Sequence, residues 1–238
     1  MEQSGTVDKA LQLLWALSRA CGSASLSELA SELRLPKPTA HRLLATLCRH
    51  ELVEQRADAR YALGVGLLRL GLGLQASDPF ARAARGHLEL AAREFGETFF
   101  LVAAKGGRLV VLEKAEGTGV LRAAPSVGSE VPVVSTASGR LFLGLSPELL
   151  GPQHEVSPTL RQGIARAVAR GFDLNQGEWI AGLTVVAAPV VSEGRLFGTV
   201  ACAGADSQLQ GDRMEQAVQW TKQVALRVSR ALATGLGG

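Results

Sequence analysis

Residues 25–52, SLSELASELRLPKPTAHRLLATLCRHEL, constrain the fold of this chain more than any other stretch. Ser25, with Glu28 three residues later, matches a capping box, in which two side chains satisfy free amide groups at a helix N-terminus. Apolar residues then follow at the spacing of one buried helical face: Leu26, Leu29, Ala30 and Leu33. The pattern breaks at residues 34–37, and Pro38 can open a second helix because its missing N–H costs nothing there. The stretch predicts two short helices joined by a tight turn.

The second helix has two faces of different chemistry. The face expected to be buried holds Ala40, Leu43, Leu44 and Leu47. The other face carries small polar and cationic side chains, of the kind that reach base edges and phosphates in a major groove. These residues are Pro38, Thr39, Arg42, Thr46 and Arg49. Periodicity alone fits a solvated amphipathic helix equally well, so the interpretation depends on what flanks this pair of helices.

A short β-hairpin is predicted directly after the second helix. Its strands are residues 53–56 and 60–63, and Arg56 and Arg60 flank the Ala57-Asp58-Ala59 tip. Residues 34–60 carry six lysines and arginines against three acidic residues, and their net charge of +3 equals that of the whole 238-residue chain. A helix-turn-helix with such a wing and this concentration of positive charge is typical of a DNA-binding domain. A helix over residues 7–17 is expected to bury Val7, Ala10, Leu11, Leu14 and Leu17 against it.

Composition and motifs exclude several other classes of protein. With 47% hydrophobic and 20% charged residues, the chain has an ordinary globular composition. Its three cysteines are widely spaced, and its histidines lack metal-ligand spacing, so neither a disulfide framework nor a metal site is expected. The sequence contains no nucleophile elbow, P-loop or dinucleotide fingerprint, and no apolar run long enough to span a bilayer. We therefore expect a cytoplasmic protein without a catalytic site, metal or cofactor, and without a membrane partner.

The second half of the chain alternates helices with strands. A Leu/Gly-rich segment, residues 65–78, is expected to form a linker helix. Beyond it, expected helices span residues 80–95, 138–145, 158–170 and 212–233, and expected strands span residues 98–104, 109–115, 120–124, 130–134, 183–191 and 196–203. Two pairs of these strands are joined by short glycine-containing turns, which indicates β-hairpins. The pattern predicts an α+β domain with one central antiparallel sheet.

The chain resembles the IclR family of bacterial transcriptional regulators along nearly its entire length. The first half resembles the family's DNA-binding domain through VDKALQLLWAL, LSELASELRLPKPTAHRLLATL and LVEQRADARYALG. The second half resembles its effector-binding domain, whose architecture is similar to GAF and PAS sensors, through VGSEVPVVSTASGRLFLG, RAVARGFDLNQGEWIAGLTVVAAPV and GRLFGTVACAGA. The resemblance implies a winged helix-turn-helix over residues 1–64, a linker helix over 65–78, and an effector-binding and oligomerisation domain over 79–238.

This resemblance implies a sequence-specific transcriptional regulator, expected to be a repressor. Its implied partners are a palindromic double-stranded DNA operator, a small organic effector, and further copies of itself in a homodimer or a dimer of dimers. On DNA, we expect the helix from Pro38 to place Thr39, Arg42 and Thr46 near base edges. Phosphates are then held by Lys37, Arg49, Arg56 and Arg60.

The same resemblance places the effector over the sheet of the second domain. The backbone N–H groups of Thr136, Ala137 and Ser138 would receive a carboxylate at a helix start. Further contacts are implied at Asn175, Val185, Ala201 and Ala203. Relatives that bind small oxo-acids carry an acidic residue, a cysteine and serines at the last four positions, where this chain has an amide and three apolar side chains. Because polar anchors fix small hydrophilic ligands, the sequence favours a larger apolar or aromatic acid, or no ligand.

Two alternatives to a ligand-responsive regulator remain open at this point. A constitutive DNA-binding protein would use its second domain only for dimerisation, and the apolar positions in the implied pocket are compatible with this. A small-molecule enzyme would need a nucleophile and a base, and the sequence offers no such pair. Cys202, between Ala201 and Ala203, is expected to point to the opposite face of its strand and into the core.

Overall fold

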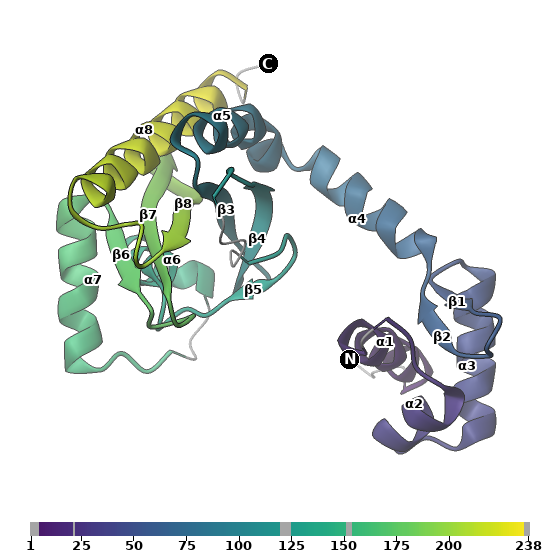
Figure 1. The fold of residues 1–238 in the computed structure, drawn as a ribbon. Helices are drawn as coiled ribbons and strands as arrows, with labels where there is room; N and C mark the ends of the chain where they lie inside the picture. Colours follow the sequence, from purple (N-terminus) through teal and green to yellow (C-terminus); the bar gives the residue numbers. More distant parts are fainter. Residues whose placement is uncertain (1–4, 21, 120–124, 151–153, 236–238) are drawn as a thin grey trace. The chain divides into compact units, whose positions relative to one another are not determined.

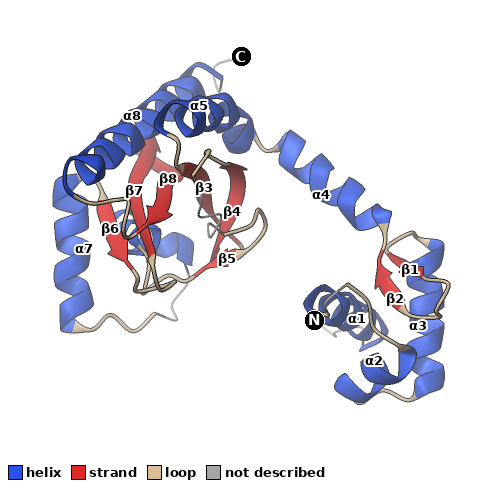
Figure 2. Cartoon of the chain, in the orientation of Figure 1, coloured by secondary structure: helices blue, strands red, loops and turns tan. Residues whose placement is uncertain are grey.

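The computed structural model describes residues 5–20, 22–119, 125–150 and 154–235 (Figures 1 and 2). The chain divides into two compact units, Met1–Leu74 and Gln75–Gly238. None of the helices in the described ranges is long and apolar enough to cross a membrane.

The first unit is a winged helix-turn-helix, as the sequence predicts. In chain order it contains α1 (Gly5–Arg19), α2 (Leu26–Glu32), α3 (Lys37–Arg49), β1 (Val53–Gln55) and β2 (Tyr61–Leu63), and α4 (Val65–Ser77) begins directly after them. β1 and β2 pair antiparallel, with Val53 opposite Leu63. The core between the helices and the wing is formed by Leu13, Leu17, Leu29, Leu44 and Tyr61, each no more than 4% exposed.

The starts of α2 and α3 follow from their sequence signals. Ser25 Oγ accepts a hydrogen bond from Glu28 N at 3.2 Å, and Glu28 Oε2 accepts one from Ser25 N at 2.7 Å, which completes the predicted capping box. α3 begins at Lys37, one residue before its predicted start, because Ala40 N already donates to Pro36 O. Pro38 therefore occupies the second helical position, where an N–H would also lack an intrahelical acceptor.

The buried face of α1 differs from the prediction. Leu13, Ala16 and Leu17 face α2, α3 and β2, whereas Val7 and Leu11 are 56% and 51% exposed. The prediction was wrong for Val7 and Leu11 because α1 has two apolar sides, and the side with Leu13, Ala16 and Leu17 is the one that packs into the core. Periodicity cannot tell which of two apolar sides meets the rest of a domain.

The second unit is an α+β domain built on one antiparallel sheet, which confirms the predicted class. Its elements are α5 (Pro79–Phe95), β3 (Thr98–Lys105), β4 (Arg108–Ala115), β5 (Glu130–Val131), α6 (Ala137–Leu145), a 3₁₀ helix (Pro147–Leu150), α7 (Pro158–Arg170), β6 (Asp173–Gln176), β7 (Leu183–Ser192), β8 (Arg195–Ala205) and α8 (Gly211–Gly235). The strand order is β5-β4-β3-β8-β7-β6. Every neighbouring pair is antiparallel.

Helices cover both faces of this sheet (Figures 1 and 2). α5 and α8 lie on one face over a cluster that includes Phe95, Phe99 and Val224, called here the α5/α8 cluster. α6 lies on the other face over a cluster that includes Phe100, Leu141 and Phe142, called here the α6 cluster. Alternate residues of β8 belong to the two clusters: Ala201 and Ala203 lie in the α6 cluster, and Cys202 lies in the α5/α8 cluster. The predicted core position of Cys202 is confirmed.

Two predictions for the strands of this sheet need correction. β6 is an edge strand that the sequence analysis missed, because Asp173, Leu174, Asn175 and Gln176 include one apolar residue only. The strand predicted over residues 130–134 ends at Val131, since Pro132 has no N–H to donate to a neighbour. The strand predicted over residues 120–124 lies outside the described residues.

Candidate DNA-binding surface and effector site

α3 presents most of the predicted DNA-binding residues on its outer face. Its inner face is held in the core by Ala40, Leu43, Leu44 and Leu47, all buried. This orientation exposes Lys37, Pro38, Arg42, Thr46 and Arg49, and leaves Thr39 half-buried. Among the described residues, no carboxylate forms an ion pair with any of the three cations on this face. The outer face of α3 therefore combines free positive charge with small polar side chains.

The two arginines of the wing have different surroundings. Arg56 lies at the exposed tip, with Nε 3.6 Å from Glu54 Oε1. Arg60 turns inward: Nη2 lies 2.9 Å from Glu28 Oε2 and 3.0 Å from the carbonyl oxygen of Ser23, and Nε lies 3.1 Å from Ser23 Oγ. The geometry favours a bracing role for Arg60, which joins the wing to the start of α2.

Glu28 has an electrostatic environment that suits this brace. The pKa of its carboxyl is lowered: the hydrogen bond from Ser25 N is the largest cause, desolvation opposes it, and the contact with Arg60 lowers the pKa further. The carboxylate is thus kept ionised for both contacts. The sequence places Glu28 in the capping box only, since the contact with Arg60 spans 32 residues of chain.

The turn between α2 and α3 contains an arginine whose backbone conformation is strained. Arg34 has φ 51°, in the left-handed region that non-glycine residues rarely occupy, and its side chain is exposed. A residue held in this conformation costs about 1 kcal/mol or more relative to glycine. Arg34 opens the segment where the sequence predicts the turn between the two helices, and it is not among the predicted DNA contacts.

The start of α6 carries the predicted anion-binding residues of the second unit. Thr136 is the N-cap: its Oγ1 accepts a hydrogen bond from Gly139 N at 3.0 Å and donates one to Pro132 O at 2.6 Å. The next two residues, Ala137 and Ser138, are buried, and their N–H groups have no hydrogen-bond partner in the described part of the chain. A helix N-terminus with free N–H groups is suited to bind a carboxylate.

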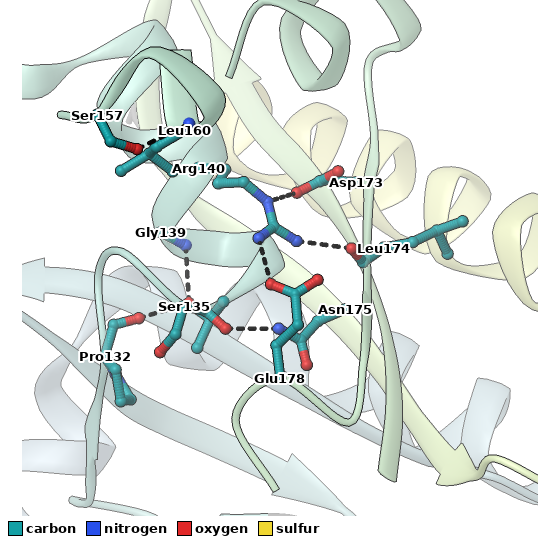
Figure 3. A network of polar contacts seen from close by, with 11 residues as sticks. Pro132, Ser135, Gly139, Arg140, Ser157, Leu160, Asp173, Leu174, Asn175 and Glu178 are labelled. Atoms are coloured by element: carbon teal, nitrogen blue, oxygen red, sulfur yellow. Dashed lines mark hydrogen bonds and ion pairs between the residues drawn. The ribbon is translucent and has the colours of Figure 1, made fainter. Parts of the chain in front are cut away.

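The remaining predicted effector residues lie together on the sheet face below α6. Asn175 of β6 pairs with Val185 of β7, which pairs with Ala203 of β8, so the three side chains share one face. Ala201 lies on the same face two residues before Ala203. All four residues are at most 5% exposed. Nδ2 of Asn175 donates a hydrogen bond to Ser135 O, the residue before the N-cap of α6 (Figure 3).

A buried arginine fastens α6 to the edge of the sheet (Figure 3). Arg140 is 8% exposed, and its guanidinium donates to Asp173, to Leu174 O at 2.7 Å and to Glu178 at 2.8 Å. Burial lowers the pKa of Arg140, but the two carboxylates outweigh burial and raise it overall. The network holds β6, and with it Asn175, against α6. The contact of Arg140 with Asp173 could not be predicted from the sequence, because β6 was not predicted.

Comparison with known proteins now identifies the family. Residues 6–57 match the IclR helix-turn-helix domain, and residues 76–149 match the C-terminal domain of the bacterial transcriptional regulator IclR. The probable transcriptional regulator SauR of Cupriavidus necator is 30% identical over 200 residues, which cover 77% of this chain and 79% of SauR. The chain belongs to the IclR family.

Other IclR-family proteins match over most of their length. The transcriptional repressor IclR of Escherichia coli is 24% identical over 237 residues, covering 90% of this chain and 85% of the repressor. An IclR homologue from Microbacterium hydrocarbonoxydans, crystallised with 4-hydroxybenzoate, has the same fold, with a TM-score of 0.80, 22% identity and coverage of 97% and 100%. The protein is therefore an IclR-family, DNA-binding transcriptional regulator, and the proteins it resembles are regulators rather than enzymes.

Proposed function

We propose that this regulator is a repressor whose binding to a DNA operator is controlled by a small organic acid. One observation supports the effector half of this proposal: beside the N-cap Thr136, the backbone N–H groups of the buried residues Ala137 and Ser138 have no partner among the residues that the structure describes. The first N–H groups of a helix have no intrahelical acceptor, and the carboxylate of a bound acid can supply one. Repression is inferred from relatives such as the E. coli repressor IclR.

On DNA, α3 is proposed to enter the major groove. Thr39, Arg42 and Thr46 then lie near base edges, where they carry sequence preference. Phosphates are contacted by exposed cations, Lys37 and Arg49 on α3 and Arg56 on the wing, which supply affinity without sequence preference. Arg60 supports the wing that carries Arg56. A regulator of this kind acts where the chromosome is, so we infer a cytoplasmic location.

In the second unit, we propose that the carboxylate of the effector lies at Thr136, Ala137 and Ser138. Its body then covers Val185, Ala201 and Ala203, whose small apolar side chains form the sheet surface below α6. Asn175 supplies a polar contact at the edge of this surface. The homologue crystallised with 4-hydroxybenzoate supports the chemical class, a small carboxylic acid with an apolar body.

We also propose that the active form is a homodimer, or a dimer of dimers, on a palindromic operator. α1 exposes Val7, Leu11 and Trp15 at 56%, 51% and 68%, spaced four residues apart on one side of the helix. α4 exposes a further group of leucines, among them Leu68 and Leu70. A second copy would bury these faces and present two recognition helices to two half-sites.

The experiment that tests the proposed function has two stages. An operator is first isolated by selection from random double-stranded DNA and mapped by footprinting, and a palindromic protected site is the expected result. Operator affinity is then measured by fluorescence anisotropy with and without aromatic and aliphatic acids. An acid-dependent change in affinity supports the proposal, and unchanged affinity with every acid favours the constitutive alternative. Light scattering of the Trp15→Ser variant, expected to shift toward monomer, tests the dimer.

A further inference from the structure

The turn between α2 and α3 is a Schellman motif, in which two hydrogen bonds close the end of a helix. Leu35 N donates to Ala30 O at 2.8 Å, and Arg34 N donates to Ser31 O at 3.2 Å. In this motif the residue at the place of Arg34 adopts the left-handed conformation, which accounts for its φ of 51°. Glycine takes this conformation without strain and is the usual residue there. The chain therefore carries an arginine at a position where the backbone alone would favour glycine.

Among the residues that the structure describes, the side chain of Arg34 has no hydrogen-bond or ion-pair partner, and it is exposed. The acidic residues of α2 are paired with other arginines. Glu32 Oε1 lies 2.8 Å from Nη2 of Arg19. Glu28 Oε2 lies 2.9 Å from Nη2 of Arg60. The positive charge of Arg34 thus remains available to a molecule outside the chain.

Arg34 precedes α3, the helix proposed to enter the major groove, by a few residues only. Lys37, the first residue of α3, is also exposed and has no ion pair in the described part of the chain. No side chain caps the start of α3, so the N–H groups of its first turn are left to other acceptors. In helix-turn-helix proteins the N-terminal end of the recognition helix lies closest to the bases, and phosphates border the groove beside it. The turn is therefore placed to meet the DNA backbone.

We propose that Arg34 binds a phosphate of the operator backbone, and that this contact accounts for the strained residue in the turn. The inference rests on the proposed placement of α3 in the major groove and adds to it a contact from outside the helix. Arginine suits this role because its guanidinium is always charged and can donate to two phosphate oxygens at once. A phosphate contact carries no sequence preference. Arg34 is thus expected to lower the stability of the fold while it raises the affinity for DNA of any sequence.

The test measures stability and DNA binding on the same full-length variants. Arg34→Gln removes the charge and keeps the backbone strain, whereas Arg34→Gly removes both. Each variant should weaken binding to the selected operator and to random DNA alike, by about five- to tenfold at roughly 0.1 M salt, and should lower the salt slope by about one unit per bound subunit. Urea unfolding without DNA should show a higher midpoint for Arg34→Gly than for the unmodified protein, and no gain for Arg34→Gln.

Two control variants separate the charge at this position from the charge of the protein as a whole. Arg34→Lys keeps a cation in the turn and should keep the salt slope. Arg161→Gln removes an exposed arginine of α7, in the second unit, which forms no ion pair within the described ranges. It changes the net charge by the same amount as Arg34→Gln and should leave both the affinity and the salt slope unchanged.

The outcomes separate this inference from the proposed placement of α3. If Arg42→Ala weakens operator binding while both Arg34 variants bind like the unmodified protein, the placement of α3 stands and the role of Arg34 is overturned. If Arg42→Ala also has no effect, the placement of α3 fails and this inference fails with it. A loss confined to the operator would indicate a base contact and overturns the phosphate assignment. A destabilised Arg34→Gln with an unchanged salt slope overturns it too, because the arginine would then act on the carbonyl end of α2.

Discussion

Arg60 of the wing and Glu28 of α2 are joined by an ion pair, with Nη2 2.9 Å from Oε2. Because Glu28 also accepts from Ser25 N, one carboxylate fixes both the start of α2 and the base of the wing. The wing is thus tied to the start of α2 through Arg60, a residue that the sequence predicts as a phosphate contact.

This contact predicts different behaviour for the two wing arginines. Arg60→Ala should lower the free energy of unfolding of the first unit by about 1 kcal/mol, because it removes hydrogen bonds to Glu28 and Ser23. Arg56→Ala should leave stability unchanged, weaken binding to all DNA sequences alike, and reduce the salt slope by about one unit. Urea unfolding and salt-dependent anisotropy measure the two effects. Equal stability of both variants would contradict the bracing role.

Arg42 is predicted to carry sequence preference. If it pairs with a guanine, Arg42→Ala should cost about 1–3 kcal/mol on the operator and relax the preference at one base pair of each half-site. Arg49→Ala, two turns further along the same face of α3 and proposed to contact a phosphate, serves as the control and should weaken binding to operator and random DNA equally. Anisotropy titrations on the operator and on single-base variants provide the measurement. Unchanged operator binding by Arg42→Ala would rule out this assignment.

Replacement of Arg34, the turn residue with a left-handed backbone, is predicted to stabilise the protein rather than destabilise it. Arg34→Gly should raise the free energy of unfolding by about 1 kcal/mol, since glycine adopts φ 51° without strain. Gly22→Ala is the mirror control: Gly22 has φ +89° with open space around it, so alanine there should destabilise through the backbone alone. Both are measured by thermal and urea unfolding without DNA. A destabilised Arg34→Gly would show that the arginine side chain stabilises the turn.

The first turn of α6 lies so close to the preceding backbone that only glycine fits. A Cβ at Gly139 would lie 1.7 Å from Val133 O, so Gly139→Ala should destabilise the second unit by about 2 kcal/mol or more. Gly86→Ala in α5 meets nothing within 4 Å and should stabilise by about 0.5–1 kcal/mol through helix propensity. Calorimetric unfolding checks both signs. A neutral Gly139→Ala would mean that the start of α6 can shift at little cost.

Asp78, the N-cap of α5, predicts a pH-dependent contribution to stability. Burial raises the pKa of its carboxyl, but hydrogen bonds from Lys105, Ala81 N and Phe80 N outweigh burial, so the pKa in the folded protein is lowered. The stabilisation is therefore present in full above the unfolded value of about 3.9 and is lost as the pH falls through the folded pKa.

Asp78→Asn keeps the cap but removes the charge. We expect a deficit of about 0.5–1 kcal/mol relative to the unmodified protein that is constant from pH 7 to pH 5 and shrinks below about pH 4. Urea midpoints over this range provide the measurement. A deficit that persists unchanged at the acid end would exclude the ion pair with Lys105 as its cause.

Local signals were enough to predict most of the fold. Ser25 and Glu28 indicate the start of α2. The two hairpins of the sheet are indicated by pairs of apolar strands joined by glycine-containing turns. β6 was missed because it is short and polar, and its position at the sheet edge is stabilised by Arg140 from another element. No local pattern encodes a contact across more than 30 residues.

The positions of the candidate site could be predicted from the sequence, but the hydrogen bonds that its side chains make could not. The resemblance pointed to Asn175 and the start of α6, yet nothing local shows that the Asn175 amide is half-satisfied by Ser135. In the first unit, charge alone could not distinguish an exposed Arg56 from an inward-turned Arg60. Both distinctions depend on which hydrogen-bonding and charged groups already have a partner in the folded chain.

The alternation of side chains along β6 fixes its alignment with β7. Leu174 packs against the α5/α8 cluster, while Asp173 and Asn175 point to the α6 side. A slip by one residue would put leucine where the amide lies and carry two polar groups into an apolar layer, so sliding of this edge strand is strongly opposed. One alignment of this edge strand therefore sets both the polar contacts that Asp173 and Asn175 make on the α6 side and the packing of Leu174 on the opposite side.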